Sequence, residues 1–275
     1  MTPSLNEPIY ALIAARNEAA RIGPVLAQLA RAGAAGCLVV ANGCHDETAA
    51  AARRFAARWP QGACRVRVIE VAAALGPDVG RAYAAYLGLR WARQAKGFVF
   101  VDGDWAGGFG PSLAAFLDRA QRDPALVAYA QARPDASRLD LALYRAASAR
   151  LAPHLAQAAV PETPLYVQKD AFDRVSPWWL HQPGLWFARC LLAGVRMVVI
   201  PRTVFDPLVR GDRTRSAPQQ RAMRETLIGD AAEAAYLLLG RRPERSWRGR
   251  QYPGLAGQRR TDLLAALAQT IHFPP

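Results

Sequence analysis

The chain has 275 residues, of which 52% are hydrophobic and 21% charged, a balance typical of a globular protein with a substantial core. No apolar run approaches the roughly eighteen residues of a membrane-spanning helix. The first ten residues also lack the basic start and apolar centre of a signal peptide. We therefore expect a cytoplasmic protein. The four cysteines show no CxxC pair and no metal-binding spacing, which indicates reduced, partly buried thiols.

The formal net charge is +13, and the basic residues are concentrated near the end of the chain. Residues 241–260, "RRPERSWRGRQYPGLAGQRR", hold seven arginines and one glutamate. Such a run suits an anionic partner, and its glycines and prolines predict a surface loop. We take Arg248 and Arg250 as the first candidates for contact with an anion. The alternative is a solvated loop that only keeps the protein in solution.

The first half of the chain alternates between apolar runs and helical patterns. Strands are predicted at residues 9–15, 37–41, 65–71 and 97–101, and helices at 18–33, 46–59, 78–95 and from 111 onward. Four strands that alternate with helices predict an α/β fold with a mostly parallel sheet covered on both faces. In such sheets ligands bind beyond the carboxyl ends of the strands.

The second half is less regular. The pattern predicts a long alanine-rich helix at 137–159, strands at 164–168 and 195–200, and a short helix from 170. Residues 176–187 are predicted to form an aromatic loop, and two further helices are expected at 217–239 and 261–271. No internal repeat is present in the sequence.

An acidic turn follows the strand at 97–101. The stretch "FVFVDGDW" places Asp102 and Asp104 on either side of Gly103. Two carboxylates this close repel each other unless a cation or water reaches them. Divalent cations prefer oxygen ligands, so the turn is a candidate metal site. A solvated Asp-Gly-Asp turn is the alternative.

Four blocks of this sequence, in order, resemble those of family 2 glycosyltransferases, which have the GT-A fold and use nucleotide sugars. "LIAARNEAARI" resembles the opening block that ends in N-E, and "VVANGCHDET" resembles V-V-D-D-G-S-T-D-G-T. "GRAYAAYLG" resembles the G-K-G-A-A-x-N-x-G block, and "FVFVDGDW" the aspartate-x-aspartate block. The resemblance implies a Rossmann-like sheet flanked by helices, with a helical C-terminal region. It also implies a nucleotide-sugar-binding half at 1–135 and an acceptor-side half at 136–275, in one continuous domain.

The resemblance assigns roles to individual residues. Asp104 is the first choice for a divalent metal, Mn²⁺ or Mg²⁺, and Asp102 for the ribose or the metal shell. The implied nucleotide-binding residues are Ala15, Arg16, Asn17, Glu18, Asn42, Gly80, Arg81, Asp102 and Gly103. Asn42 stands where an aspartate commonly meets uracil, so the choice between a UDP-sugar and a GDP-sugar stays open. Structural alternatives are a helix start for Asn17 and Glu18, a helix cap for Asp46 and a solvated helix surface for Arg81.

The general base of inverting family members is missing from its usual place. Their E-D-x-x-L-x-x-R block aligns with Arg189 and Gly194, but Gln182-Pro183 occupies the E-D position. Neither residue can take a proton. His181 is the proposed catalytic substitute, since imidazole titrates near neutral pH, and Glu162 is a second candidate. A retaining mechanism, a relocated base and lost activity all remain open.

These observations favour a metal-dependent hexosyltransferase with an unidentified acceptor. An anionic or lipid-linked acceptor and peripheral contact with a membrane surface stay open, and nucleic acid is not expected. Trp178, Trp179 and Trp186 form either a platform for a sugar or part of the core. A nucleotidyltransferase is the first alternative, but "AARNEAARIG" lacks the glycine-rich loop it would need. The second is an inactive GT-A protein that binds nucleotide and an anionic partner.

Overall fold

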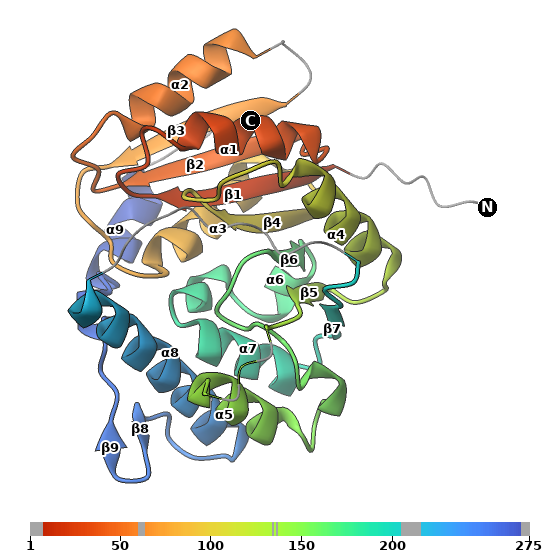
Figure 1. The fold of residues 1–275 in the computed structure, drawn as a ribbon, viewed down its shortest axis with the longest axis vertical. Helices are drawn as coiled ribbons and strands as arrows, with labels where there is room; N and C mark the ends of the chain where they lie inside the picture. Colours follow the sequence, from red (N-terminus) through yellow and green to blue (C-terminus); the bar gives the residue numbers. More distant parts are fainter. Residues whose placement is uncertain (1–7, 60–63, 134, 136, 205–215, 271–275) are drawn as a thin grey trace.

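The computed structural model describes residues 8–59, 64–133, 135, 137–204 and 216–270. Within these residues a seven-stranded sheet has the strand order β3-β2-β1-β4-β6-β5-β7 (Figure 1). Its strands are β1 (Ile9–Ala15), β2 (Gly36–Asn42), β3 (Arg65–Val71), β4 (Gly97–Asp102), β5 (Val127–Ala130), β6 (Leu165–Gln168) and β7 (Met197–Ile200).

The first four strands run parallel, as the sequence pattern predicts. β1 pairs with both β2 and β4, and β2 pairs with β3. β6 lies antiparallel between β4 and β5, and β7 runs parallel to β5. The carboxyl ends of β1, β2 and β4 therefore meet at one edge of the sheet.

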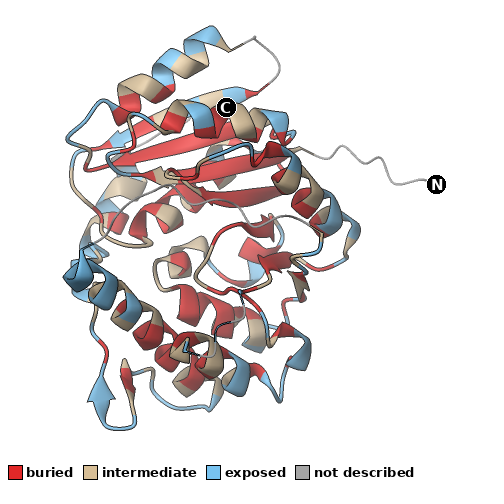
Figure 2. Cartoon of the chain, viewed as in Figure 1, coloured by how far each residue is buried: buried red, intermediate tan, exposed pale blue. Residues whose placement is uncertain are grey.

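Helices cover both faces of the sheet. Side chains alternate along β1, so that Tyr10 and Leu12 enter one core while Ala11 and Ile13 enter the other. The face of Ala11 is covered by α1 (Ile22–Arg31), α2 (Thr48–Arg58) and α4 (Gly110–Arg122). The core on the Leu12 face is formed with side chains of α3 (Val79–Trp91), α5 (Leu139–Ser148), α7 (Pro183–Leu192) and α8 (Ala217–Leu238). Figure 2 shows the central strands buried on both faces, which explains their continuous apolar runs.

Two predictions for the second half are wrong. The long helix at 137–159 ends at Ser148, and the chain continues as a 3₁₀ turn, η1 (Pro153–Leu155). Pro153 lacks an N–H and its ring clashes with the preceding turn, so the alanine-rich pattern cannot continue through it. The aromatic loop at 176–187 is a 3₁₀ helix, η2 (Pro177–His181), followed by α7. Pro183 is the first residue of α7, where proline is tolerated.

The arginine-rich stretch is only partly a surface loop. It contains a short hairpin of β8 (Ser246–Trp247) and β9 (Arg250–Gln251), followed by η3 (Ala256–Gln258) and then α9 (Asp262–Thr270). The side chains of Arg245 and Arg259 are only 15% and 4% exposed, because both form internal ion pairs.

The short helix predicted from residue 170 is present as α6 (Ala171–Arg174). The four cysteines are free thiols, three of them buried, in agreement with the sequence interpretation. Across the described part of the chain, no helix is both long enough and apolar enough to cross a bilayer.

Candidate nucleotide and metal site

Two adjoining cavities open at the carboxyl edge of the parallel strands. The first chamber, of about 850 Å³, is bounded by the ends of β1, β2 and β4 and by the starts of α3 and α8. The second chamber, of about 340 Å³, lies beyond the acidic turn and reaches Arg138 and Glu162. Both chambers are lined by Ala14, Arg16, Pro77, Asp78, Arg81, Asp102 and Met223. Their sizes suit small-molecule ligands, which typically occupy clefts of about 300–1,000 Å³.

Asp102 stands at the junction of the two chambers, at the end of β4. The Thr163 hydroxyl donates a hydrogen bond of 2.6 Å to its Oδ2. Its Oδ1 lies 4.0 Å from a guanidinium nitrogen of Arg81. These two neighbours hold the carboxylate in place, while its side chain stays 41% exposed toward the cavities.

The turn after Asp102 is fixed from both sides. A Cβ added to Gly103 would lie only 3.0 Å from the Cβ of Ala15, so the turn packs closely on the end of β1. Trp105 is buried and meets the ring of Phe109 edge-on, with centroids 5.0 Å apart. Between these anchors, Asp104 lines the second chamber. Ala15 and Gly103 therefore support the acidic turn through packing.

The opening block forms a turn that ties β1 to the loop after β2. Asn17 adopts a positive φ of 57°, and its Oδ1 accepts the backbone N–H of His45 at 2.9 Å. The backbone N–H of Glu18 donates to the Thr48 hydroxyl at 2.7 Å, and the Glu18 side chain lines the second chamber. Since α1 begins after this turn, a helix start at Asn17 is wrong. Asp46 accepts the N–H of Thr48, but the N-cap of α2 is Glu47, so Asp46 lies one residue before the predicted cap position.

Asn42 and Gly80 bring β2 and α3 together on the wall of the first chamber. Asn42 is buried at the end of β2, and its Oδ1 accepts the backbone N–H of Leu75 at 2.6 Å. A Cβ on Gly80 would lie 3.0 Å from the Asn42 amide nitrogen. The glycine thus lets the N-terminus of α3 approach Asn42 closely. Free N–H groups and the helix dipole favour an anion at such a terminus.

Arg81 brings a positive charge to the junction of the chambers. Its side chain is only 13% exposed, which contradicts a solvated helix surface. Its Nη1 lies 3.4 Å from Asp78 Oδ1 and donates to the carbonyl oxygen of Pro161 at 3.4 Å. Burial raises the pKa of Asp78, although Arg81 and Arg259 oppose the change.

Glu162 and Arg138 form the far wall of the second chamber. Glu162 Oε1 accepts a hydrogen bond of 3.0 Å from Arg138 Nη1. Asp140 binds the same guanidinium through Nε at 2.8 Å and Nη2 at 2.6 Å. The structure thus brings Glu162, Asp102 and Asp104 to the lining of one cavity.

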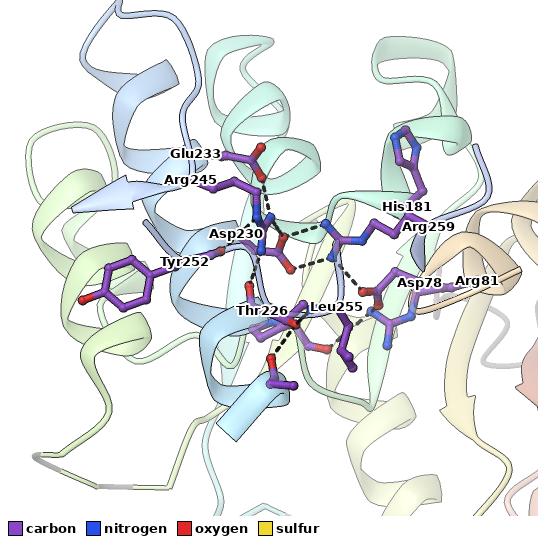
Figure 3. Close-up of polar contacts among 12 residues, drawn as sticks. Asp78, Arg81, His181, Thr226, Asp230, Glu233, Arg245, Tyr252, Leu255 and Arg259 are labelled. Carbon is purple, nitrogen blue, oxygen red and sulfur yellow. Dashed lines mark hydrogen bonds and ion pairs between the residues drawn. The ribbon is translucent and has the colours of Figure 1, made fainter. Parts of the chain in front are cut away.

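His181 lies in η2, beside Arg259 (Figure 3). Its Nδ1 is hydrogen-bonded to the carbonyl oxygen of Trp178, and its ring stacks on Trp179 with centroids 6.0 Å apart. Because a carbonyl oxygen only accepts, Nδ1 carries the hydrogen and Nε2 keeps the lone pair. Burial lowers the pKa of His181, which favours the neutral imidazole. Its role as a base stays a prediction.

Of the tryptophans near His181, Trp186 is buried in the core, and Trp178 and Trp179 are partly buried and pack against it. Trp186 is 1% exposed, and Trp178 stacks on Tyr86 of α3 with centroids 4.4 Å apart. The guanidinium of Arg189 lies 3.7 Å from the ring centroid of Trp179, a cation–π contact. These contacts support the core alternative over a sugar platform.

Arg248 and Arg250 lie on the hairpin, while other parts of the arginine-rich stretch line the first chamber. Arg250 Nη2 lies 3.1 Å from Glu225 Oε1, and both Arg248 and Arg250 are exposed. Leu255 and Gln258 line the first chamber instead. Anion binding by the two arginines therefore stays a prediction.

Sequence reasoning missed several parts of the site. It did not identify Thr163 and Asp78, which hold Asp102 and Arg81. It also missed the start of α8, where Pro218, Gln219, Ala222 and Met223 close the first chamber. The αL conformation of Asp78, φ 64°, had a weak signal in the Gly-Pro-Asp turn. The sequence gives no signal that the start of α8 lines the first chamber, because that placement depends on the tertiary fold.

The donor set fits a hard divalent cation. Asp102 and Asp104 offer carboxylate oxygens, the ligands that Mg²⁺ and Mn²⁺ prefer. The described residues contain no group of three or more His, Cys, Asp or Glu arranged to hold a metal by themselves. Mg²⁺ is commonly held by one or two carboxylates together with substrate phosphates and water. The two aspartates therefore suit a metal that binds together with a diphosphate.

Neither a protein-family model nor a curated protein sequence matches this chain. Solved structures match it in fold. One is glucosyl-3-phosphoglycerate synthase from Mycobacterium tuberculosis with Mn²⁺, UDP and phosphoglyceric acid, at a TM-score of 0.57 and 16% identity. The match covers 82% of this chain and 79% of that one. The same enzyme with Mg²⁺ and UDP matches at a TM-score of 0.56 and 16% identity, over 82% and 80% of the two chains.

The chain has the GT-A fold. A third complex of the M. tuberculosis enzyme, with Mn²⁺, UDP and glucosyl-3-phosphoglycerate, matches at a TM-score of 0.54 and 17% identity, over 82% and 80% of the chains. The predicted α/β class, with its mostly parallel sheet, flanking helices and helical C-terminal region, is therefore confirmed. At these identities the likeness establishes the fold alone.

Proposed function

We propose that this protein is a metal-dependent glycosyltransferase that uses a nucleoside-diphosphate sugar, with a UDP-sugar as the first donor to test. The observation that carries the proposal is the junction of the two chambers. There the carboxylate of Asp102, the guanidinium of Arg81 and the N-terminus of α3 line one cavity wall. The UDP and the Mn²⁺ or Mg²⁺ bound by the structural neighbours support it.

Each chamber takes a part of the donor in this proposal. The first chamber holds the nucleoside, with the Asn42 amide beside the base. Arg81 and the α3 N-terminus face the diphosphate, since both favour negative charge. Asp104 and Asp102 hold the metal. When bound, a divalent cation neutralises the charge that builds up on the departing diphosphate.

The second chamber receives the transferred sugar and the acceptor. The acceptor oxygen forms a bond to the anomeric carbon as the bond to the diphosphate oxygen breaks. In an inverting reaction a base takes the hydroxyl proton, and Glu162 and His181 are the proposed bases. A hexosyl donor, a GDP-sugar alternative, an anionic or lipid-linked acceptor and a cytoplasmic location stay predictions.

Calorimetric titration with UDP, with and without Mn²⁺, tests the proposal. We expect Mn²⁺ to strengthen UDP binding by the wild type and Asp104→Asn to lose most of that gain. The matched control is Asp118→Asn, because Asp118 is a half-exposed aspartate on α4 that pairs with Arg122. Equal Mn²⁺-dependent affinities in wild type and Asp104→Asn would contradict the assignment of the metal site.

A further inference from the structure

A buried ion network joins the end of the chain to the nucleotide side of the sheet (Figure 3). Its centre is Asp230, a residue of α8 that is 1% exposed. Arg245 Nη1 binds Asp230 Oδ1 at 2.5 Å, and Glu233 at 2.8 Å. A buried carboxylate is costly unless it is paired, and here two arginines of the C-terminal stretch supply the pairing.

Arg259 connects this centre to the start of α3. Its Nη1 and Nη2 both donate to Asp230 at 2.8 Å, in a bidentate pair. The same Nη2 donates to Asp78 Oδ2 at 3.2 Å. The Arg259 side chain is 4% exposed, so solvent screens these contacts little. A single guanidinium thus holds two carboxylates that lie far apart in the sequence.

The backbone around Arg259 also holds the loop before α3. The N–H of Arg260 donates to the carbonyl oxygen of Leu75 at 2.9 Å. Gly76 has a φ of 81°, and a Cβ there would clash with the carbonyl oxygen of Gln258. The N–H of Leu75 in turn donates to Asn42 on the wall of the first chamber. Residues 258–260 therefore fix the loop at 75–78, and with it part of the chamber.

Among the described residues, Asp78 pairs with Arg81, which lines both chambers, and with Arg259, which lines neither. Arg259 lies behind the loop, whereas Arg81 lies at the chamber junction, 4.0 Å from Asp102. Without Arg259, Arg81 would be the one remaining cationic partner of Asp78 within the described part of the chain. Arg81 would then be drawn toward Asp78, and less of its charge would be available to an anionic ligand.

We propose that Arg259 is a positioning residue for the nucleotide site. It neutralises Asp78 from behind and fixes the loop at 75–78, so that Arg81 and Asn42 face the ligand. This role rests on the proposed binding of a nucleoside diphosphate. It assigns a function in ligand affinity to a residue outside the chamber lining, in the stretch where we expected direct contact with an anion.

The test is calorimetric titration of UDP with Mn²⁺ into the full chain and its variants. Arg259→Gln should weaken binding about tenfold, the size of change that residues coupled to a site through a network produce. The double variant Asp78→Asn/Arg259→Gln removes the unpaired carboxylate, so its affinity should return to within about threefold of wild type. Arg259→Lys keeps the charge but cannot span both carboxylates, and it should bind more weakly than wild type.

Arg245→Gln is the matched control, because Arg245 binds the same Asp230 while its other partners are Glu233 and the carbonyl oxygens of Thr226 and Tyr252. It should lower the melting temperature and leave the UDP affinity unchanged. If Arg245→Gln loses as much UDP affinity as Arg259→Gln, the network only stabilises the fold, and the positioning role of Arg259 is contradicted. The lysine variant decides the matter if Arg259→Gln does not fold, and wild-type affinity in Arg259→Lys would then overturn the proposal.

Two negative results are distinguishable. A wild-type chain that binds no nucleoside diphosphate, with or without metal, contradicts the proposed function and this role together. If the wild-type chain binds UDP and Arg259→Gln binds it with the same affinity, only the positioning role is contradicted.

Discussion

Removing Asp230 should cost the protein a large part of its stability. Asp230→Ala leaves Arg259 with Asp78 and Arg245 with Glu233 as their remaining carboxylate partners. Breaking a buried ion pair by removing one partner costs about 3–5 kcal/mol, because the remaining charge is uncompensated. Both arginines keep a second acidic partner, so we expect the lower end, about 3 kcal/mol. For a chain of this size that corresponds to a fall in melting temperature of about 6–12 °C.

Thermal unfolding followed by circular dichroism measures this effect. The matched control is Asp262→Ala, which removes an aspartate–arginine pair from the same part of the chain. The side chains of Asp262 and Arg260 are 60% and 47% exposed, so the variant should melt close to wild type. If Asp230→Ala and Asp262→Ala melt at the same temperature, burial does not determine the importance of these pairs and the reasoning is wrong.

Three further predictions concern the base, the pH dependence and the hairpin. In assays of initial rate, Glu162→Gln should lower turnover about 100-fold, since Glu162 lines the second chamber. His181→Ala should lower it less than about tenfold. If His181→Ala has the larger effect, His181 is the base. Burial raises the pKa of Glu233, so the stability linked to its protonated form is lost as pH rises through that pKa. Glu233→Gln mimics the protonated acid and does not lose this stability. The melting temperature of the variant minus that of wild type should therefore increase as the pH rises from about 4 to about 7, and a constant difference would contradict this. Replacing Arg248 and Arg250 together by alanine should raise the KM for an anionic substrate and flatten its salt dependence, and unchanged values would leave the hairpin without a binding role.

The regular part of the fold could be predicted from the sequence because local pattern and tertiary position agree there. β1, β2 and β4 are buried on both faces, so each is a continuous apolar run bounded by turn residues. β3 lies at the edge of the sheet, and its charged and apolar residues alternate as expected for a half-buried strand. β5 (Val127–Ala130) was missed because four residues, two of them alanine, carry too little pattern. The start of α7 lies within the stretch predicted as an aromatic loop, because a proline at the first position of a helix resembles a turn residue in the sequence alone.

The candidate site divides in the same way. Asp102 and Asp104 could be found because they lie at the end of a predicted strand, where local pattern locates the edge of the sheet. Arg81 could be found because its block resembles that of a known family. The partners that hold them could not. Thr163 contacts Asp102 across 61 residues of sequence, and Arg259 contacts Asp78 across 181. Such pairs depend on tertiary packing, which a single sequence does not display.

The contact between residues 258–260 and the loop at 75–78 has a consequence for the order of events during synthesis. Strands β1 to β4 leave the ribosome early and can form their parallel sheet while the rest of the chain is still being made. The N–H of Arg260 reaches the carbonyl oxygen of Leu75 only after the chain has been released as far as residue 260, long after these strands. The first chamber is therefore completed only after residues 258–260 have been synthesised, and a chain truncated before Arg259 would carry its acidic turn and its sheet without a finished ligand pocket.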